Sequence, residues 1–151
     1  MEMKNLLRRR IGIVLCLALF LFSSLSASAF YAGFSEVSSC PAYRQFAVRP
    51  ATELSKIIYL IDRFANEKIE VLYDGNYYSA PFAAKVARWF LSRRYSKENA
   101  QAWVLKWCNA STPAGNLIWV KMPDGEFVLA REMLLTELQR LQEELAKNPA
   151  K

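Results

Sequence analysis

The sequence predicts an α+β fold in which four helices pack with a small antiparallel sheet of about three strands. Two patterns support this prediction. Four stretches repeat apolar residues at intervals of three and four, and three shorter stretches of strand-forming residues lie beside turn-forming pairs such as Asp-Gly. Residues 51–147 are numerous and aromatic enough to bury one core, so we expect a single domain there.

Residues 1–29 are predicted to be a secretory signal peptide. Lys4 and Arg8 to Arg10 precede an uncharged apolar run at 11–22, and the small residues Ala27 to Ala29 form an A-x-A site. The run is short for a membrane span, which needs about 20 residues. We therefore expect export to the periplasm of a Gram-negative bacterium. Retention of the segment as an uncleaved anchor is the alternative.

Residues 30–50 contain Gly33, Pro41 and several serines without a sustained period, which predicts an extended N-terminal arm. The other predicted elements are a helix at 51–66, a strand at 69–73, helices at 79–94 and 96–108, strands at 117–122 and 126–129, and a helix at 131–147. The pairs Asp74-Gly75 and Asp124-Gly125 predict tight turns, and the second of these closes a hairpin.

The helix at 96–108 is expected to organise the core. Trp103, Val104, Trp107 and Cys108 lie on one stripe of this helix, with polar residues on the opposite side. Each indole buries a large apolar area and needs a partner for its N–H group. We interpret the two tryptophans mainly as core packing, with a ligand-stacking role as the alternative.

Cysteine usage is consistent with export. Cys16 lies in the predicted signal peptide, which leaves Cys40 and Cys108 in the exported chain. An even number in an oxidising compartment predicts a disulfide between them, which would stabilise the fold by about 4 kcal/mol in the chain-entropy model. Two alternatives remain: free thiols with Cys108 buried, and lipidation of Cys40 after the segment Val37 to Ser39.

The charge balance excludes one class of partner. The chain has 20 Lys and Arg and 14 Asp and Glu, of which four basic residues and one acidic residue lie in the predicted signal peptide. The remainder has 16 basic and 13 acidic residues, a net charge of +3, with no dense basic run. We therefore expect no nucleic-acid partner, and membrane contact only through the signal segment before its cleavage.

The order of these elements over residues 69–138 resembles the YfeK-like family of small exported bacterial proteins, which carry a domain of unknown function. The resemblance is carried by the strand VLYDG (71–75), the helix segment QAWVLKWC (101–108), the turn from Ser111 to Gly115, the strand ending at Lys121, and the leucine-bearing C-terminal helix. It implies an exported domain and no particular activity.

Catalytic and metal-binding patterns are missing from the sequence. The chain has no histidine, which excludes Ser-His and Cys-His nucleophilic systems and His-ligated zinc. It also has no Gly-rich phosphate loop and no C-x-x-C pair. We expect no enzyme activity, metal or cofactor. Glu70, Asp74, Asp124 and Glu126 lie at or beside strands, so a glycan hydrolase that uses two carboxylates is an alternative.

We therefore expect an exported binding module of the bacterial envelope, which contacts a protein or peptide through an aromatic surface or through the leucine stripe of the C-terminal helix. Alternatives are a small cell-wall or glycan hydrolase and a structural or stress-related envelope protein. Candidate contact residues come from the Tyr pair after the first turn, the polar turn and the third strand: Tyr77, Tyr78, Ser111, Thr112, Gly115 and Trp119.

Overall fold

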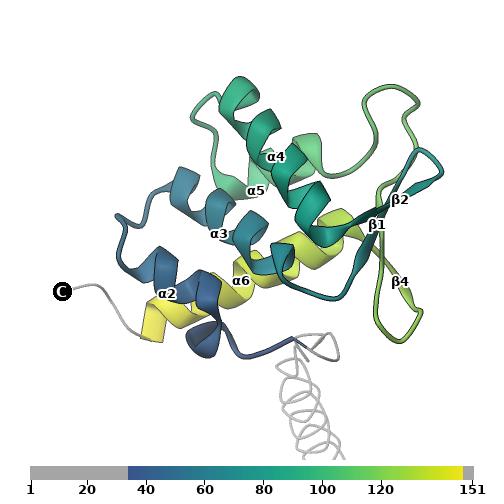
Figure 1. Ribbon diagram of the computed structural model, residues 1–151. Coiled ribbons are helices and arrows are strands. Elements are labelled where there is room, and N and C mark those ends of the chain that lie inside the picture. Colours follow the sequence, from purple (N-terminus) through teal and green to yellow (C-terminus); the bar gives the residue numbers. More distant parts are fainter. Residues whose placement is uncertain (1–33, 148–151) are drawn as a thin grey trace, which may run out of the picture. The chain divides into compact units, whose positions relative to one another are not determined.

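The fold was taken from a computed structural model that describes residues 34–147, so the predicted signal peptide at 1–29 lies outside the described residues. Helices pack with one antiparallel sheet in an α+β arrangement (Figure 1). The elements are η1 (Val37–Ser39), α2 (Pro41–Ala47), α3 (Glu53–Ala65), β1 (Glu70–Tyr73), β2 (Asn76–Ser79), α4 (Ala80–Arg94), α5 (Ala100–Trp107), β3 (Trp119–Lys121), β4 (Phe127–Leu129) and α6 (Ala130–Lys147).

The predicted fold class is confirmed, but the number of elements is larger than expected. The described residues form five α-helices and a four-stranded antiparallel sheet, where four helices and three strands were predicted. The additional helix, α2, lies with η1 in the segment predicted as an extended arm. The additional strand, β2, contains Tyr77 and Tyr78, which we had placed in a connection between the turn and the next helix.

Helix α2 is short, and local features determine where it begins. The Cys40 Sγ atom accepts a hydrogen bond from the Tyr43 backbone N at 3.3 Å, and Pro41 occupies the first helical turn, where its missing N–H costs nothing. Ala42 and Phe46 are buried against the helical core. Two buried positions are too few to form a recognisable period, which explains why the arm prediction was wrong.

The sheet has the strand order β2-β1-β3-β4, with every neighbouring pair antiparallel. The β1–β2 hairpin turns at Asp74 and Gly75, whose φ angles of 47° and 78° match the left-handed pair that tight hairpins use. The register places Val71 beside Val120 and Tyr78 on the face toward the helices, because Val120 is buried in the core and Tyr78 packs on Phe82 of α4. The neighbouring positions therefore lie on the opposite, outer face.

Helix α3 is the central helix of the described part. Thr52 caps its N-terminus, with Oγ1 accepting from the Ser55 backbone N at 3.1 Å. Its buried residues, including Ile57 and Leu60, belong to a core shared with α2, α4, α5 and α6. A second apolar cluster, which includes Val120 and Met133, joins the inner face of the sheet to α6. In Figure 1, α4 and α6 lie on opposite sides of α3.

The leucine stripe of the C-terminal helix faces inward. Leu138 and Leu141 are 2% and 0% exposed, and Leu134 and Leu145 pack against the same core. The alternative that this stripe docks a partner is therefore wrong, because the fold itself covers it. Within the part of the chain that the structure describes, no helix is both long and apolar enough to cross a membrane.

The predicted Cys40–Cys108 disulfide is not formed, since both residues are free thiols. Cys40 is 1% exposed, and its sulfur lies 4.0 Å from the Tyr59 Oη atom while capping α2. Cys108 is the C-cap of α5. The expectation from an even cysteine count fails because the two residues lie at the ends of different helices: the Cys40 sulfur caps the start of α2, and the Cys108 backbone N–H bonds to the Val104 carbonyl at the end of α5.

Candidate functional site

The described part contains an apolar cavity of about 480 Å³. It lies between α4 and α5 on one side and α3, α6 and the inner face of the sheet on the other. None of its lining residues is Asp, Glu, Lys or Arg. The side chains that define it include Leu60, Ile61 and Phe64 from α3, Val71 and Tyr78 from the hairpin, Phe82, Ala83, Val86, Ala87 and Phe90 from α4, Trp103 and Trp107 from α5, Cys108, and Met133 and Leu134 from α6.

The cavity exists because α4 presents small side chains to its neighbours. Ala80, Ala83, Ala84 and Ala87 all line it, at the spacing of one helix face. Larger residues at these positions would fill the space between α4 and the sheet. Native interiors contain few voids larger than a water molecule, so a hollow of this size differs from an ordinary packing defect.

The cavity wall carries an unsatisfied hydrogen-bond donor. Trp103, which lines the cavity, is 4% exposed, and its Nε1 atom has no hydrogen-bond partner among the described residues. The Trp107 ring packs edge-on against Phe90 with ring centroids 4.9 Å apart. A buried N–H without an acceptor costs about 1–3 kcal/mol, so a ligand with one acceptor oxygen would relieve that cost.

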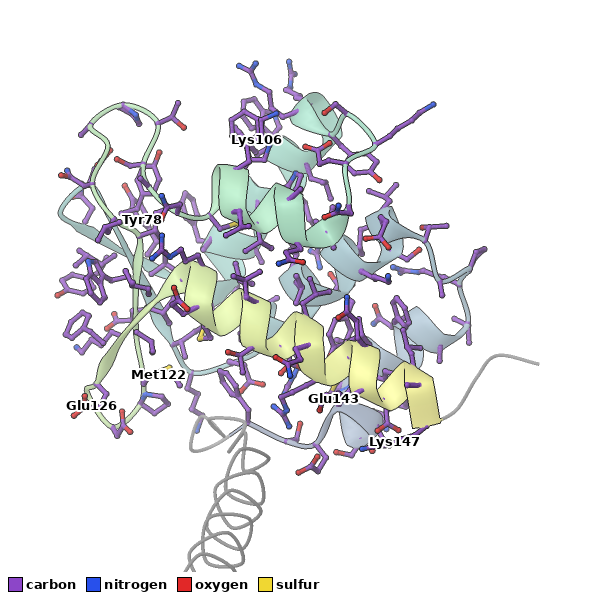
Figure 2. The ribbon with its side chains drawn as sticks, turned by 180° about the vertical axis from the view of Figure 1, so that it is seen from behind. Tyr78, Lys106, Met122, Glu126, Glu143 and Lys147 are labelled. Atoms are coloured by element: carbon purple, nitrogen blue, oxygen red, sulfur yellow. The ribbon has the colours of Figure 1, made fainter. Side chains whose placement is uncertain are left out.

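Exposed residues in the lining mark the mouth of the cavity. Phe82 and Val86 of α4 are 51% and 47% exposed although both line the hollow, and Thr112 on the far side is also exposed. Phe82 stacks on Tyr78 with centroids 5.4 Å apart and an interplanar angle of 14°. Tyr78 lies on the sheet side of the molecule, and α5 with Lys106 on another (Figure 2). The stacked pair therefore joins α4 to the sheet at one edge of the mouth.

The six candidate contact residues fall into three groups. Tyr78 and Thr112 line the cavity. Ser111 and Gly115 instead shape the loop beside it: Ser111 is 3% exposed and its Oγ donates to Asp74 Oδ1, while Gly115 has a φ of 70° and donates its N–H to the Ser111 carbonyl at 3.0 Å. Their hydroxyl and backbone groups are occupied within the fold.

Tyr77 and Trp119 lie away from the cavity. Both are paired with Leu72 in the sheet register and so share its outer face, where Tyr77 is 53% exposed. The Lys121 ammonium lies 5.7 Å from the centre of the Tyr77 ring. These two candidates belong to a separate aromatic surface, and they form no common site with Tyr78 and Thr112.

Sequence reasoning missed the contribution of α4. None of the predicted contact residues lies on this helix, although Phe82, Val86 and Phe90 line the cavity. The available signal was the run of alanines on the inward face of a helix whose outer face also carries Phe82 and Trp89. Such a pattern indicates a helix with apolar side chains on two faces, where those on the inward face are small and those on the outer face are large.

Three of the four carboxylates considered for hydrolysis are occupied elsewhere. Asp74 accepts hydrogen bonds from Ser111 and, at 3.1 Å, from Asn116 Nδ2. Glu70 pairs with Lys121 at 3.4 Å, and Asp124 accepts the Glu126 N–H at 3.0 Å within its turn. None of them lines the main cavity or a smaller one of about 250 Å³ between α2, α3 and α4. Among residues 34–147, no group of three His, Cys, Asp or Glu could hold a metal.

Comparison of the chain with family models, curated proteins and solved structures found no match. The resemblance to the YfeK-like family therefore stays a prediction.

Proposed function

We propose that the protein is an exported, non-catalytic binding module of the bacterial envelope that takes an apolar ligand in the cavity beneath α4. The observation that supports this proposal is the cavity itself, which holds about 480 Å³ and is lined by no charged side chain. Ligand sites typically enclose about 300–1,000 Å³ and are lined mainly by hydrophobic and aromatic residues. The cavity fits both descriptions.

The lining indicates the class of ligand. An extended apolar group such as a fatty acyl chain suits walls built from alanine, valine, leucine and aromatic rings. The buried Trp103 Nε1 atom without a partner favours a ligand that carries an acceptor oxygen, such as an acyl carbonyl. A charged group would have to stay at the mouth, because the interior offers no counter-charge.

The alternatives have less support. A glycan hydrolase needs two carboxylates about 5 Å or 6.5 to 9.5 Å apart across a substrate, whereas the cavity has no carboxylate in its wall. A purely structural envelope protein would not require a ligand cavity. We therefore propose no activity for Glu70, Asp74, Asp124 or Glu126.

A filled-cavity variant tests the proposal. Ala87→Phe places a ring in the hollow, and the matched control Ala102→Phe makes the same change on α5 at an exposed position outside the lining. Binding of a fluorescent polyene fatty acid, followed by its emission and by tryptophan quenching, is expected for the parent and the control and not for Ala87→Phe. Saturable binding that survives in Ala87→Phe, or no binding by the parent, would overturn the proposal.

A further inference from the structure

Positive charge is concentrated on the segment that covers the cavity. Residues 80–107, which contain α4, α5 and their connection, have six basic side chains and one acidic one, a net charge of +5. The described residues 34–147 have 15 basic and 13 acidic side chains, so the part outside this segment has 9 and 12, a net charge of −3. The described part, with a net charge of only +2, is therefore strongly polarised.

Five of these six cations have no anionic partner in the described structure. Arg88 pairs with Asp62, whereas Lys85, Arg93, Arg94, Lys97 and Lys106 form no ion pair with any residue of 34–147. Two of the five lie over aromatic rings: the Arg93 guanidinium is 4.9 Å from the Trp89 ring centre, and the Lys106 ammonium is 4.7 Å from that of Trp107.

The same segment exposes a row of large apolar side chains. Phe82, Val86 and Trp89 follow one another at i, i+4 and i+7 on the outer side of α4, and they are 51%, 47% and 57% exposed. Arg93 continues the row one turn later. We call Phe82, Lys85, Val86, Trp89, Arg93 and Lys106 the α4 face. Figure 2 shows Lys106 at an end of the molecule far from Glu143 and Lys147 of α6.

We propose that the α4 face docks on the surface of an anionic phospholipid bilayer. Tryptophan rings favour the headgroup region of a membrane, and Lys and Arg side chains near an anionic surface are attracted to it. The Arg93 and Lys106 charges lie over the rings of Trp89 and Trp107. The apolar and cationic parts of the face would therefore reach the same depth in the membrane interface. A helix that lies at a membrane interface typically combines exposed apolar and aromatic side chains with Lys and Arg in this way.

A bilayer suits the α4 face better than an acidic protein because of what lies behind it. Phe82 and Val86 belong both to the exposed row and to the mouth of the cavity. Docking would therefore place the cavity mouth against the source of acyl chains, while phosphate groups meet the unpaired cations. Docking does not require a ligand in the cavity, so the proposed membrane contact is independent of the proposed ligand binding.

The test is co-sedimentation of the full chain with vesicles of phosphatidylcholine alone and of phosphatidylcholine with phosphatidylglycerol. The double variant R93E/K106E is compared with R49E/K68E, which makes the same change in net charge at two exposed, unpaired positions outside the α4 face. This control also accounts for any contribution of residues 1–33, which are common to both variants.

We expect the anionic vesicles to bind the parent and R49E/K68E alike and to bind R93E/K106E at least about tenfold more weakly, with salt weakening the parent's binding. Trp89→Ser should also weaken binding, whereas Phe127→Ser, at a residue 44% exposed on β4, should not. Equal losses in both charge-reversed variants, equal binding to both kinds of vesicle, or no vesicle binding would overturn the proposal. Retention of vesicle binding by Ala87→Phe would separate docking from cavity occupancy.

Discussion

Arg63 and Glu137 form an ion pair in the interior, with Nε and Oε1 3.0 Å apart and each side chain 3% exposed. The Tyr59 hydroxyl donates to the same Glu137 oxygen at 2.5 Å, and Arg140 Nη1 donates to the other at 3.1 Å. The Arg63 guanidinium also donates to the Ser35 carbonyl at 2.8 Å. This network attaches the segment before α2 to α3 and α6, so the region predicted as an extended arm is part of the fold.

Removal of the Glu137 charge should destabilise the protein strongly. Glu137→Leu leaves Arg63 buried with only Glu67 as an anionic partner and removes the acceptor of the Tyr59 hydroxyl. We expect a loss of about 3 kcal/mol in the free energy of unfolding, measured by urea denaturation. Glu143→Leu, an exposed change on the same helix, should stay within about 0.5 kcal/mol. Similar losses for both variants would contradict a special role for the buried pair.

The Cys108 thiol predicts a loss of stability at alkaline pH. Burial raises the pKa of Cys108 from 9.0 to about 12, because the thiol faces the apolar cavity. Because the folded-state pKa is raised, the contribution of the protonated Cys108 thiol to the free energy of unfolding is complete below the unfolded-state pKa, near 9. That contribution is lost as the pH rises toward 12. Between pH 9 and 10.5, the parent should lose about 1.5 kcal/mol more than Cys108→Ala.

The measurement is urea unfolding of both proteins across that pH range. Burial and the Glu137 charge also raise the pKa of Tyr59, which destabilises the fold at high pH in the same direction. Tyr59 is present in both proteins, so its effect cancels in the difference. A difference that does not change with pH would show that the Cys108 thiol ionises equally easily in the folded and unfolded chain.

The free thiols predict a clear labelling result. Cys40 and Cys108 should both react with an alkylating agent when the protein is unfolded in urea without reductant, and neither should react quickly in the folded state at pH 8, because one is 1% exposed and the other has a raised pKa. Mass spectrometry of the peptides measures both. A cross-linked Cys40–Cys108 peptide would contradict the structure.

Strong periodicity made much of the fold predictable. Helix α3 was expected at 51–66 and runs from Glu53 to Ala65, because its apolar residues repeat over several turns. Strand β2 was missed because four residues after an Asp-Gly turn carry little alternation of their own. The cavity was beyond sequence reasoning, since its size depends on how the alanines of α4 face residues from α3, α5, α6 and three strands of the sheet. The prediction of the Cys40–Cys108 disulfide was wrong because the number of cysteines says nothing about the distance between their sulfurs.

Asp74 provides the last prediction, because one residue supports both the hairpin and the loop at the cavity mouth. Its φ of 47° lies in the left-handed region, and its carboxylate accepts from Ser111 and Asn116. Asp74→Ala loses the acceptor and disfavours this backbone conformation, so we expect a loss of about 2 kcal/mol. Asp74→Asn keeps an acceptor oxygen and tolerates the conformation, so it should lose less than half as much.

The two variants should also differ in ligand binding. The loop anchored by Asp74 holds Thr112, whose backbone N donates to the Tyr73 Oη atom at 3.3 Å, and both residues line the cavity. Loosening this loop should weaken fatty-acid binding in Asp74→Ala more than in Asp74→Asn, measured by fluorescence titration at a temperature where both remain folded. Equal affinities with unequal stabilities would show that the loop supports the fold without shaping the cavity mouth.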